Sequence, residues 1–516
     1  MEYTIDDSPT VNTTDKAARI LEKYKEAVSV KDHWREKFEE AYEYCLPNRE
    51  SFYDESPGQR RTDKIFDETA VVGVQEFASR LQSGIVPTFA RWADFQAGVE
   101  IPEEERSQVN LQLDKITEYV FEVLQNSNFN QEVHEAFMDL AVGTGCMLVE
   151  EGDAVNPVKF TAVPLPKVCL LNGPDGKIDT VYRTRKVKPE HVSVLYPKAV
   201  MPENFDLLQQ KKELVIIEAV YKIHQDNEEK YKYCVVLENP KAVIFEEEYE
   251  GEGSNPYLVF RWNKASGEVY GRGPVFNAMG AIKTCNLTVE LILQNAQMSV
   301  SGVYTYEDDG VINPDNIALV PGSLIPVAPG SRGLSAIQSA SNFDVAQLVL
   351  QDMRANIKKA LYMEALGRPE GTPMTATEVS ERMADLSRQI GSSFGRLQSE
   401  FIHPLLKRII RILSKQGRIE LPKVNGREVK IGARSPLAQA QHMQDVSDIN
   451  RFNEIIAGTF GPQMINVIVN QNETAKYLAE KMNLPEKLIR DEEEQKQIIQ
   501  QISQLQTSAG EGEIPQ

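Results

Sequence analysis

The strongest constraint on the fold is a pair of long helical segments separated by a short region rich in turns. Apolar residues recur at helical spacing over 274–299, and Pro274 suits the first position of a helix, where its missing N–H is not needed. Residues 342–362 have the same helical pattern, whereas residues 300–340 hold short β-prone runs and many turns. With a rise of about 1.5 Å per residue, the first helix is roughly 39 Å long. The pattern predicts a projecting stalk with a compact tip.

The apolar residues of these two helices cover more than one helical face. An isolated hairpin with this pattern would leave apolar surface in water. Packing side by side against identical hairpins covers that surface, so the pattern favours a ring or bundle of copies. The apolar positions are Phe276, Met279, Ile282, Cys285, Leu287, Val289, Leu291, Ile292 and Leu293 in the first helix, and Val345, Leu348, Val349, Met353, Ile357, Ala360 and Leu361 in the second.

The rest of the chain alternates between helical and β-rich stretches, which indicates a mainly helical α+β protein. At 516 residues it exceeds the size of one compact core. Before the stalk we predict helices and then strands in a mostly antiparallel region of residues 146–260. The helices are expected at 15–45, 67–84, 103–126 and 128–142, and the strands at 181–187, 214–223, 231–238 and 257–262.

After the stalk, a loop of residues 367–373 precedes a long helix over 375–416, which Pro404 should kink. Its start fits a helix-capping box, in which a threonine and a glutamate satisfy the first backbone amides. A short β segment (418–431) and helices at 435–457 and 461–481 follow. The residues singled out at the start of the long helix are Thr375, Thr377, Glu378 and Arg382.

The charge balance is acidic, with 56 Lys and Arg residues against 76 Asp and Glu residues, a net charge of −20. A protein that grips phosphates needs a basic face, and this chain has no basic excess. A surface past which DNA must slide should instead repel phosphate, so a DNA partner stays open. No run of eighteen apolar residues occurs, so we expect no membrane span.

Sequence motifs give little support for catalysis or a metal. Five scattered cysteines without a Cys-x-x-Cys pair, and six histidines without ligand spacing, indicate no zinc site, no cofactor and a reducing compartment. Residues 391–395 match the Gly-x-Ser-x-Gly pattern of serine hydrolases, but that pattern requires a strand before it. Here we interpret it as small residues at a helix bend or packing face, and a hydrolase using Ser393 is the lesser alternative.

A glycine-rich segment joins the β-rich region to the first long helix. Glycine permits unusual backbone angles and proline then starts the helix, so the segment reads as a hinge that launches the helix, or as a plain β-to-α turn. It consists of Tyr270, Gly271, Arg272, Gly273 and Pro274.

Three stretches, taken in order, resemble a known family. Residues 61–92 hold a basic start, an aspartate, a Leu-x-Ser-Gly helix and an Arg-Trp end. Arg261-Trp262 precedes the glycine-rich segment, and residues 375–382 open the long helix. With the hairpin between the last two, the chain resembles the portal, or head-to-tail connector, proteins of T7-like, short-tailed (podovirus-type) bacteriophages.

The resemblance implies a dodecameric ring with a central channel at one capsid vertex. Genomic DNA is packaged through this channel by the terminase and later ejected through it. The implied partners are further copies of the chain, the terminase large subunit, a tail adaptor or connector protein, the major capsid and scaffolding proteins, and non-specifically held double-stranded DNA, but no membrane. The protein would act in the virion after assembly in the host bacterial cytoplasm, without a catalytic site. Another ring-forming virion protein, such as a tail adaptor or internal core protein, is the alternative.

The resemblance also implies a division of the chain into parts. These are a disordered arm (1–14), a wing (15–273, helical over 15–145 and β-rich over 146–270), stem helices (274–299 and 342–363), a clip (300–341), a tunnel loop (364–374), a long wing helix (375–416), a crown or barrel (417–506) and a disordered tail (507–516).

Two of these parts carry predicted contact residues. Residues 301–340 hold four acidic residues and one basic residue, a net of −3 per copy that disfavours adhesion to phosphate. In the tunnel loop, Arg368 is the candidate for a transient phosphate contact, or equally for an intersubunit salt bridge. The loop residues are Gly367, Arg368, Pro369, Glu370, Gly371 and Thr372, and the clip docking residues are Tyr304, Tyr306, Glu307, Asp308, Asp309 and Arg332.

Overall fold

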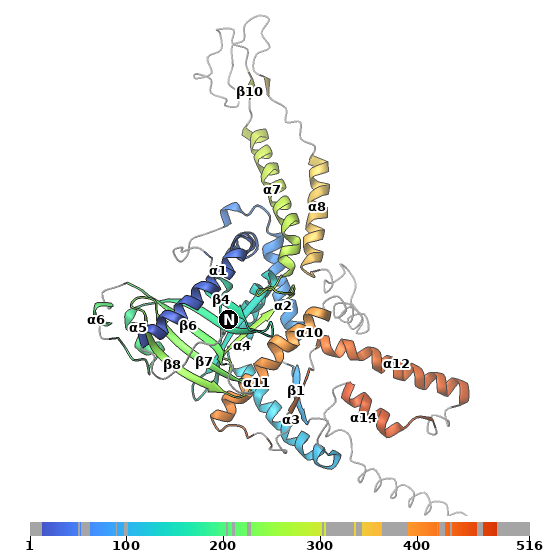
Figure 1. Cartoon of the computed structure of the whole chain (residues 1–516). Helices are drawn as coiled ribbons and strands as arrows, with labels where there is room; N and C mark the ends of the chain where they lie inside the picture. The colour runs from blue at the N-terminus through green and yellow to red at the C-terminus, as the bar shows by residue number, and fades with distance from the viewer. Residues whose placement is uncertain are drawn as a thin grey trace, which may run out of the picture.

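A body of helices and antiparallel sheets carries two long helices that project from one end (Figure 1). The projecting helices are α7 (Pro274–Ser301) and α8 (Phe343–Ala360), which pack against each other and match the two predicted stalk helices. The computed structural model describes residues 13–49, 52, 62–88, 90–97, 102–202, 205–208, 212–223, 229–301, 304–305, 335–336, 343–363, 391–420, 422, 429–433, 436–461 and 468–481.

The largest sheet has five antiparallel strands in sequence order. Side chains alternate between its two faces, so that Ile217 packs under helix α1 (Thr13–Cys45) while Ile216 packs under the short helices α5 (Pro189–Leu195) and α6 (Phe205–Leu208). Each face therefore has its own apolar core. The strands are β4 (Val168–Asn172), β5 (Ile178–Val187), β6 (Leu214–Ile223), β7 (Lys230–Leu237) and β8 (Ala242–Glu250).

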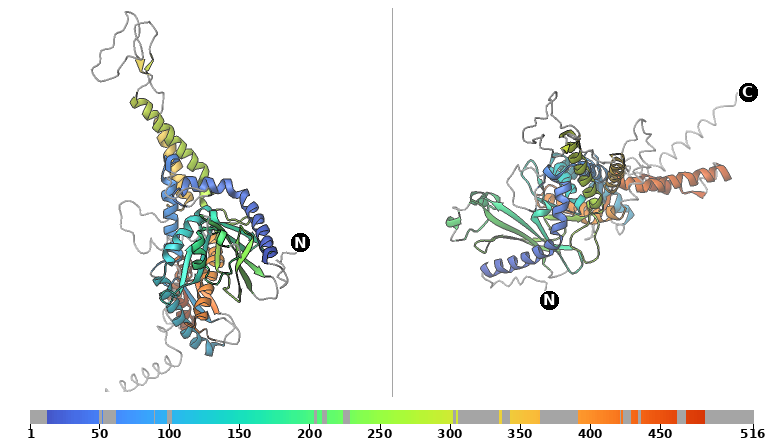
Figure 2. Two further views of the ribbon diagram at one scale, coloured as in Figure 1. Left: turned by 90° about the vertical axis from the view of Figure 1, so that its left-hand side faces the viewer. Right: turned by 90° about the horizontal axis from the view of Figure 1, so that it is seen from above.

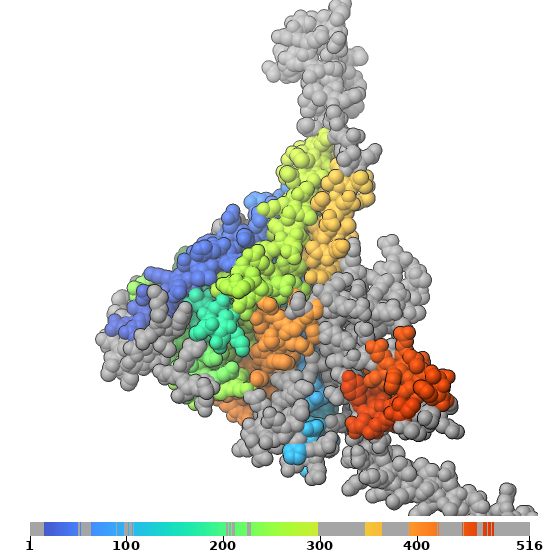
Figure 3. Space-filling view, turned by 45° about the vertical axis from the view of Figure 1, so that its right-hand side comes forward, coloured from blue at the N-terminus to red at the C-terminus, as the bar shows by residue number. Residues whose placement is uncertain are grey.

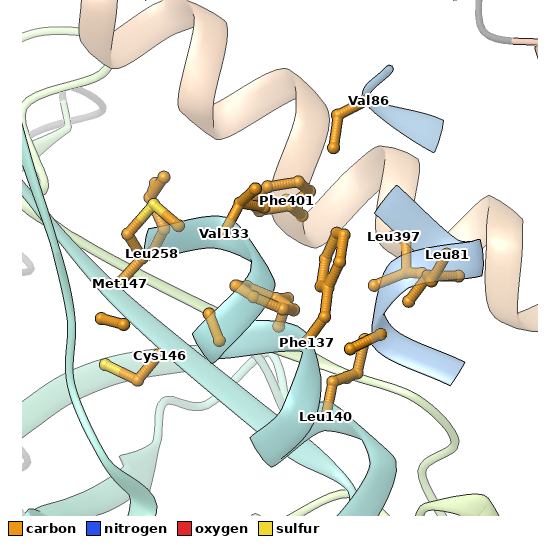
Figure 4. Close-up of a cluster of buried hydrophobic side chains, with 14 of the residues drawn as sticks. Leu81, Val86, Val133, Phe137, Leu140, Cys146, Met147, Leu258, Leu397 and Phe401 are labelled. Atoms are coloured by element: carbon orange, nitrogen blue, oxygen red, sulfur yellow. The ribbon is translucent and has the colours of Figure 1, made fainter. Parts of the chain in front are cut away.

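The main core lies where a three-stranded sheet meets the helices of the body. Its strand order is β3-β2-β9, and Phe137, Met147, Leu258 and Phe401 are among the side chains that interdigitate there (Figure 4). The elements are β2 (Thr144–Glu151), β3 (Val158–Ala162), β9 (Tyr257–Arg261), the 3-10 turns Thr62–Lys64 and Leu165–Lys167, and helices α2 (Thr69–Ile85), α3 (Glu103–Asn126) and α4 (Phe129–Val142).

The kink predicted at Pro404 takes the form of a π-helical turn. Helix α10 (Gly391–Leu397) continues through a π segment (Gln398–Ile402) into α11 (His403–Lys415). Pro404 has no N–H with which to continue the α-helical hydrogen-bond pattern. Next to it, the backbone N–H of His403 donates to the carbonyl of Gln398, five residues back, which is the π-helical pattern. The first part of this predicted helix, 375–390, lies outside the described residues.

Two-stranded pairings join distant parts of the chain. Strand β1 (Ala93–Ala97) pairs antiparallel with β12 (Val429–Ala433), so part of the predicted crown region adds to the N-terminal body. The predicted β segment at 418–431 therefore begins later than expected, at Val429. Helices α12 (Pro436–Phe460) and α14 (Gln471–Lys481) follow, and residues 462–467 of the helix predicted at 461–481 lie outside the described residues.

Several expectations need correction at their edges. Thr13 and Thr14, assigned to the N-terminal arm, already belong to α1. The predicted helix at 67–84 begins at Thr69, after Glu68 at its N-cap, and the carboxylate of Asp67 just before it accepts a hydrogen bond from the Thr69 N–H at 3.0 Å. Strands β1 (Ala93–Ala97), β2, β3, β4 and β8 and helices α5 and α6 were not predicted, whereas the four strands predicted before the stalk are all present.

The projecting pair extends well beyond the body when the molecule is seen from the side (Figure 2, left). Beyond its described helices, β10 (Tyr304–Thr305) pairs with β11 (Ser335–Ala336), which shows that the ends of the intervening segment meet. None of the helices in the described part of the chain has the length and apolar character needed to cross a membrane.

Candidate functional site: the base of the projecting helical pair

The glycine-rich segment before α7 crosses the chain at the end of α4 with almost no space between the two backbones. A side-chain carbon on Gly273 would lie 2.0 Å from the carbonyl oxygen of Ala141, and one on Gly271 would lie 2.2 Å from that of Gly143. Gly143 itself has a φ of 149°, a conformation that other residues rarely adopt. The Gly273 N–H donates to Val142 and the Gly271 N–H to the Thr144 hydroxyl. The segment is therefore a tight crossing of two backbones, from which the chain turns from the β-rich region into α7.

Tyr270 and Arg272 fix this crossing on either side. Tyr270 is fully buried beside Phe38, with ring centroids 5.5 Å apart, and its hydroxyl accepts the N–H of Leu170 at 3.1 Å. Burial raises the pKa of this hydroxyl well above its ordinary value. The Arg272 guanidinium stacks 5.2 Å from the Trp34 ring and pairs with Glu268. Pro274 then opens α7, as the sequence predicted.

A polar clamp, which sequence reasoning missed, holds the two projecting helices to the segment before α2. The Asn286 side chain of α7 accepts the N–H of Phe66 at 2.7 Å and donates to the Lys64 carbonyl at 2.9 Å. The Arg354 side chain of α8 donates twice to Asp67, at 2.9 and 2.7 Å. We call Asp67, Asn286 and Arg354 the base clamp.

The electrostatics of the clamp favour the charged form of its carboxylate. Burial alone would raise the pKa of Asp67, but hydrogen bonds from Thr69 and Arg354 outweigh that effect, so the pKa lies below its ordinary value. Lys283 of α7 and Glu40 of α1 form a further ion pair close to the clamp. The base of the pair is thus tied to α1 and α2 by charge as well as by packing.

The end of α8 is seated on α2. Leu361 is fully buried, and its methyl carbon lies so close to Gly73 of α2 that a side-chain carbon there would meet it at 2.5 Å. Arg80 of α2 donates to the carbonyls of Tyr362 and Met363. The chain therefore leaves α8 toward residue 364 from a fixed position.

The Arg261-Trp262 pair, which carried part of the resemblance, joins β9 to the π segment. Arg261 donates through its backbone N–H and side chain to Glu400, and Trp262 is buried with its ring 5.2 Å from that of Phe77. Ser393 is buried in α10, where its hydroxyl donates to the Asn263 side chain at 3.0 Å. This agrees with a packing role for the Gly-x-Ser-x-Gly stretch.

The outer part of the helical pair is exposed. Leu287 and Leu291, one turn apart on α7, are 53% and 54% exposed, and Leu348 on α8 is 62% exposed. The space-filling view shows α7 and α8 side by side, leaving the body together (Figure 3). Most other predicted contact residues (Tyr306, Glu307, Asp308, Asp309, Arg332, residues 367–372, Thr375, Thr377, Glu378 and Arg382) lie outside the described residues, and Tyr304 is described only through its pairing with Ala336.

Comparison with known proteins gives relatives along most of the chain. A portal protein of Salmonella phage epsilon15 is 23% identical, covering 81% of this chain and 77% of its own length. A probable portal protein of Bordetella phage BPP-1 is 23% identical, with coverages of 84% and 81%. The portal protein of Escherichia phage T7 is 22% identical over 37% of this chain and 38% of its own length. Chains of a solved gene transfer agent particle match with a TM-score of 0.36 and 13% identity, covering 82% of this chain and 94% of theirs.

The match to a family model decides the assignment. Residues 17–489, nearly the whole chain, match the model described as bacteriophage head to tail connecting protein. The predicted resemblance to portal proteins of T7-like phages is confirmed by this match and by the portal proteins among the relatives. The chain belongs to the bacteriophage head to tail connecting protein family.

Proposed function

We propose that copies of this protein assemble into a dodecameric ring around a channel at one capsid vertex, and that double-stranded genomic DNA enters and later leaves through it. The observation that carries this proposal is the helical pair, which is fixed to the body at its base and exposes leucines along its outer half. Apolar surface of this kind is stable in water only when covered, and neighbouring pairs in a ring would cover it. Family membership supports the same assembly.

The acidic balance suits a channel that conducts DNA without gripping it. With a net charge of −20 per copy, a ring carries a strongly negative field that keeps phosphates from adhering. In this proposal the ring is passive, and the terminase large subunit supplies the energy of packaging. The chain itself performs no catalysis.

We assign parts of the proposed channel as follows. Helices α7 and α8 form the stem, and residues 300–341 form the clip, which docks the terminase during packaging and the tail adaptor afterwards. Residues 364–374 form the tunnel loop, with Arg368 nearest to the DNA phosphates. Residues 15–273 and 375–416 form the wing, where contacts with the major capsid and scaffolding proteins belong, and 417–506 form the crown.

Electron microscopy of the purified full chain tests the ring. We expect closed rings with a central hole. Particles that stay monomeric at every salt concentration from low to physiological ionic strength would overturn the proposal, since a stem with uncovered leucines could not then be explained by neighbouring copies.

The tunnel loop has a separate test. Deletion of residues 366–372 should leave the rings intact and reduce the amount of DNA packaged or retained in particles. The matched control removes seven residues, 510–516, from the C-terminal tail and should leave both rings and DNA content unchanged. Normally filled, infectious particles from the loop deletion would remove the loop from the proposal and leave the ring standing.

A further inference from the structure

A second surface of interest lies at the outer end of the five-stranded sheet, away from the base of α7 and α8 (Figures 1 and 2). A groove of about 440 Å³ opens there between the end of β5, helix α5 and the start of β6. Its apolar lining is aliphatic and comes from Val187, Val194 and Leu195. Val194 is 74% exposed, and Val200 just beyond α5 is 76% exposed. Aliphatic side chains are thus presented to solvent around a concave surface.

The charge around this groove is opposite to that of the chain. Three basic residues and one acidic residue, Glu213, line the groove, and the buried Glu218 pairs with Arg185, so the lining keeps a basic excess within a protein of net charge −20. Arg185, Lys186 and Lys188 line the groove beside its aliphatic floor. A local basic rim attracts acidic partners, whereas the rest of this acidic surface repels them.

The groove is held in shape by a buried charge network. Glu218 in the centre of the sheet accepts a hydrogen bond from Arg185 at 3.1 Å and another from the Tyr196 hydroxyl at the end of α5. Burial alone would raise the pKa of Glu218, but Arg183 and the hydroxyls of Tyr196 and Tyr257 outweigh it, so the pKa lies below its ordinary value. Val192 anchors α5 from beneath and is fully buried. A surface fixed in this way pays little conformational entropy when it binds.

We propose that this groove, which we call the α5 groove, docks an acidic amphipathic segment of another polypeptide. Aliphatic side chains of that segment would fill the space over Val187, Val194 and Leu195, while its carboxylates face Lys186 and Lys188. A nucleic acid fits less well, because its phosphate backbone offers nothing apolar and Glu213 also lines the groove. The inference goes beyond the proposed channel, since the groove lies in the proposed wing, away from α7 and α8.

A reporter at the groove can detect such binding directly. All five native cysteines are buried, so Ser193→Cys on the exposed side of α5 provides a single site for a solvent-sensitive dye. Val155→Cys, at a position 83% exposed in another loop, is the matched control. The probes are an 18-residue helical peptide with leucines on one face and glutamates on the other, the same peptide with lysines in place of glutamates, and a short DNA duplex.

We expect the acidic peptide to shift dye emission at position 193 and not at position 155. Lys188→Glu or Val194→Asp should weaken this binding by about tenfold, whereas Lys177→Glu and Val155→Asp should leave it unchanged. The proposal is overturned if the DNA duplex binds more tightly than the acidic peptide, if the basic peptide binds equally well, or if no probe shifts the emission at position 193.

Discussion

The two halves of helix α7 differ sharply in what covers them. At the inner end, Val275 and Ala278 are at most 2% exposed, whereas Leu287 and Leu291 farther out are more than half exposed. Both halves are apolar and belong to one continuous helix. The inner half is covered by the body of the same chain, whereas the outer half packs against α8 on one side and leaves Leu287 and Leu291 exposed on the other. The same composition therefore serves folding at one end and is available for association at the other.

Polar contacts follow the same division. Near the boundary between the halves, Asn286 of α7 holds the segment before α2, and Lys283 pairs with Glu40 of α1. Arg354 holds the same segment from α8. A helical pair fixed at its boundary and bare beyond it can keep its direction before any neighbouring copy arrives. The comparison predicts that substitutions at the base change stability, while substitutions farther out change association.

The largest effect is expected at the glycine crossing. Gly273→Ala would place a carbon 2.0 Å from the Ala141 carbonyl oxygen, so the base of α7 must move away from α4. We expect a loss of about 3 kcal/mol or more in the free energy of unfolding. Urea denaturation of the full chain, followed by circular dichroism, measures this loss.

Gly280→Ala is the control within the same helix. An added side-chain carbon at Gly280 meets nothing within 4 Å, and alanine is the better helix former. This substitution should be neutral or stabilise by up to about 1 kcal/mol. Equal losses from the two substitutions would show that the crossing does not determine the stability of the base.

Local sequence pattern was enough to predict much of this architecture. Helical periodicity and the position of Pro274 placed both projecting helices within two residues of their observed ends. The β-branched runs at 214–223 gave the central strand of the large sheet. These features depend on side chains that are neighbours in the sequence, and such neighbours are visible in a single sequence.

The base clamp and the glycine crossing were not predictable in this way. Asp67 and Arg354 are separated by 287 positions, and the local sequence around either residue does not indicate that they pair. From the sequence alone, Gly271 and Gly273 permit unusual backbone angles at a hinge or turn. A glycine that is needed for close backbone approach has the same identity in the sequence, so the two roles cannot be told apart there. Strand β8 was missed because its glutamates leave few apolar residues in alternation.

The second-largest effect on the free energy of unfolding is expected from removing the charge of Asp67 in the base clamp. Asp67→Asn keeps an oxygen for the Thr69 N–H but removes the ion pair with Arg354. We expect a loss of about 1–2 kcal/mol near neutral pH, less than for a fully buried pair because the Arg354 side chain is 45% exposed. Thermal unfolding of the full chain at neutral pH measures this change.

The stability that Asp67 contributes should fall on acidification. The folded pKa of Asp67 lies below its ordinary value, so its contribution is present above that ordinary value, about 3.9, and is lost as the pH falls through the folded pKa. The difference between wild type and Asp67→Asn should therefore shrink on acidification. Lys415→Gln, which removes an exposed pair with Glu151, should cost less than about 1 kcal/mol. A difference that grows on acidification would contradict the assigned role of Asp67.

The smallest effect on the stability of the chain is expected at the outer leucines, where the effect on association should be greatest. The double substitution Leu287→Gln and Leu291→Gln alters side chains already more than half exposed, so the free energy of unfolding of a single copy should change by about 0.5 kcal/mol or less. Association should weaken, because the stripe that neighbouring copies would cover becomes polar. Analytical ultracentrifugation separates the two effects, with Val155→Gln, 83% exposed on the body, as the control. If the double variant assembles as readily as this control, the outer half of α7 is not an association surface, and the contrast between the two halves reflects only where the body of the chain ends.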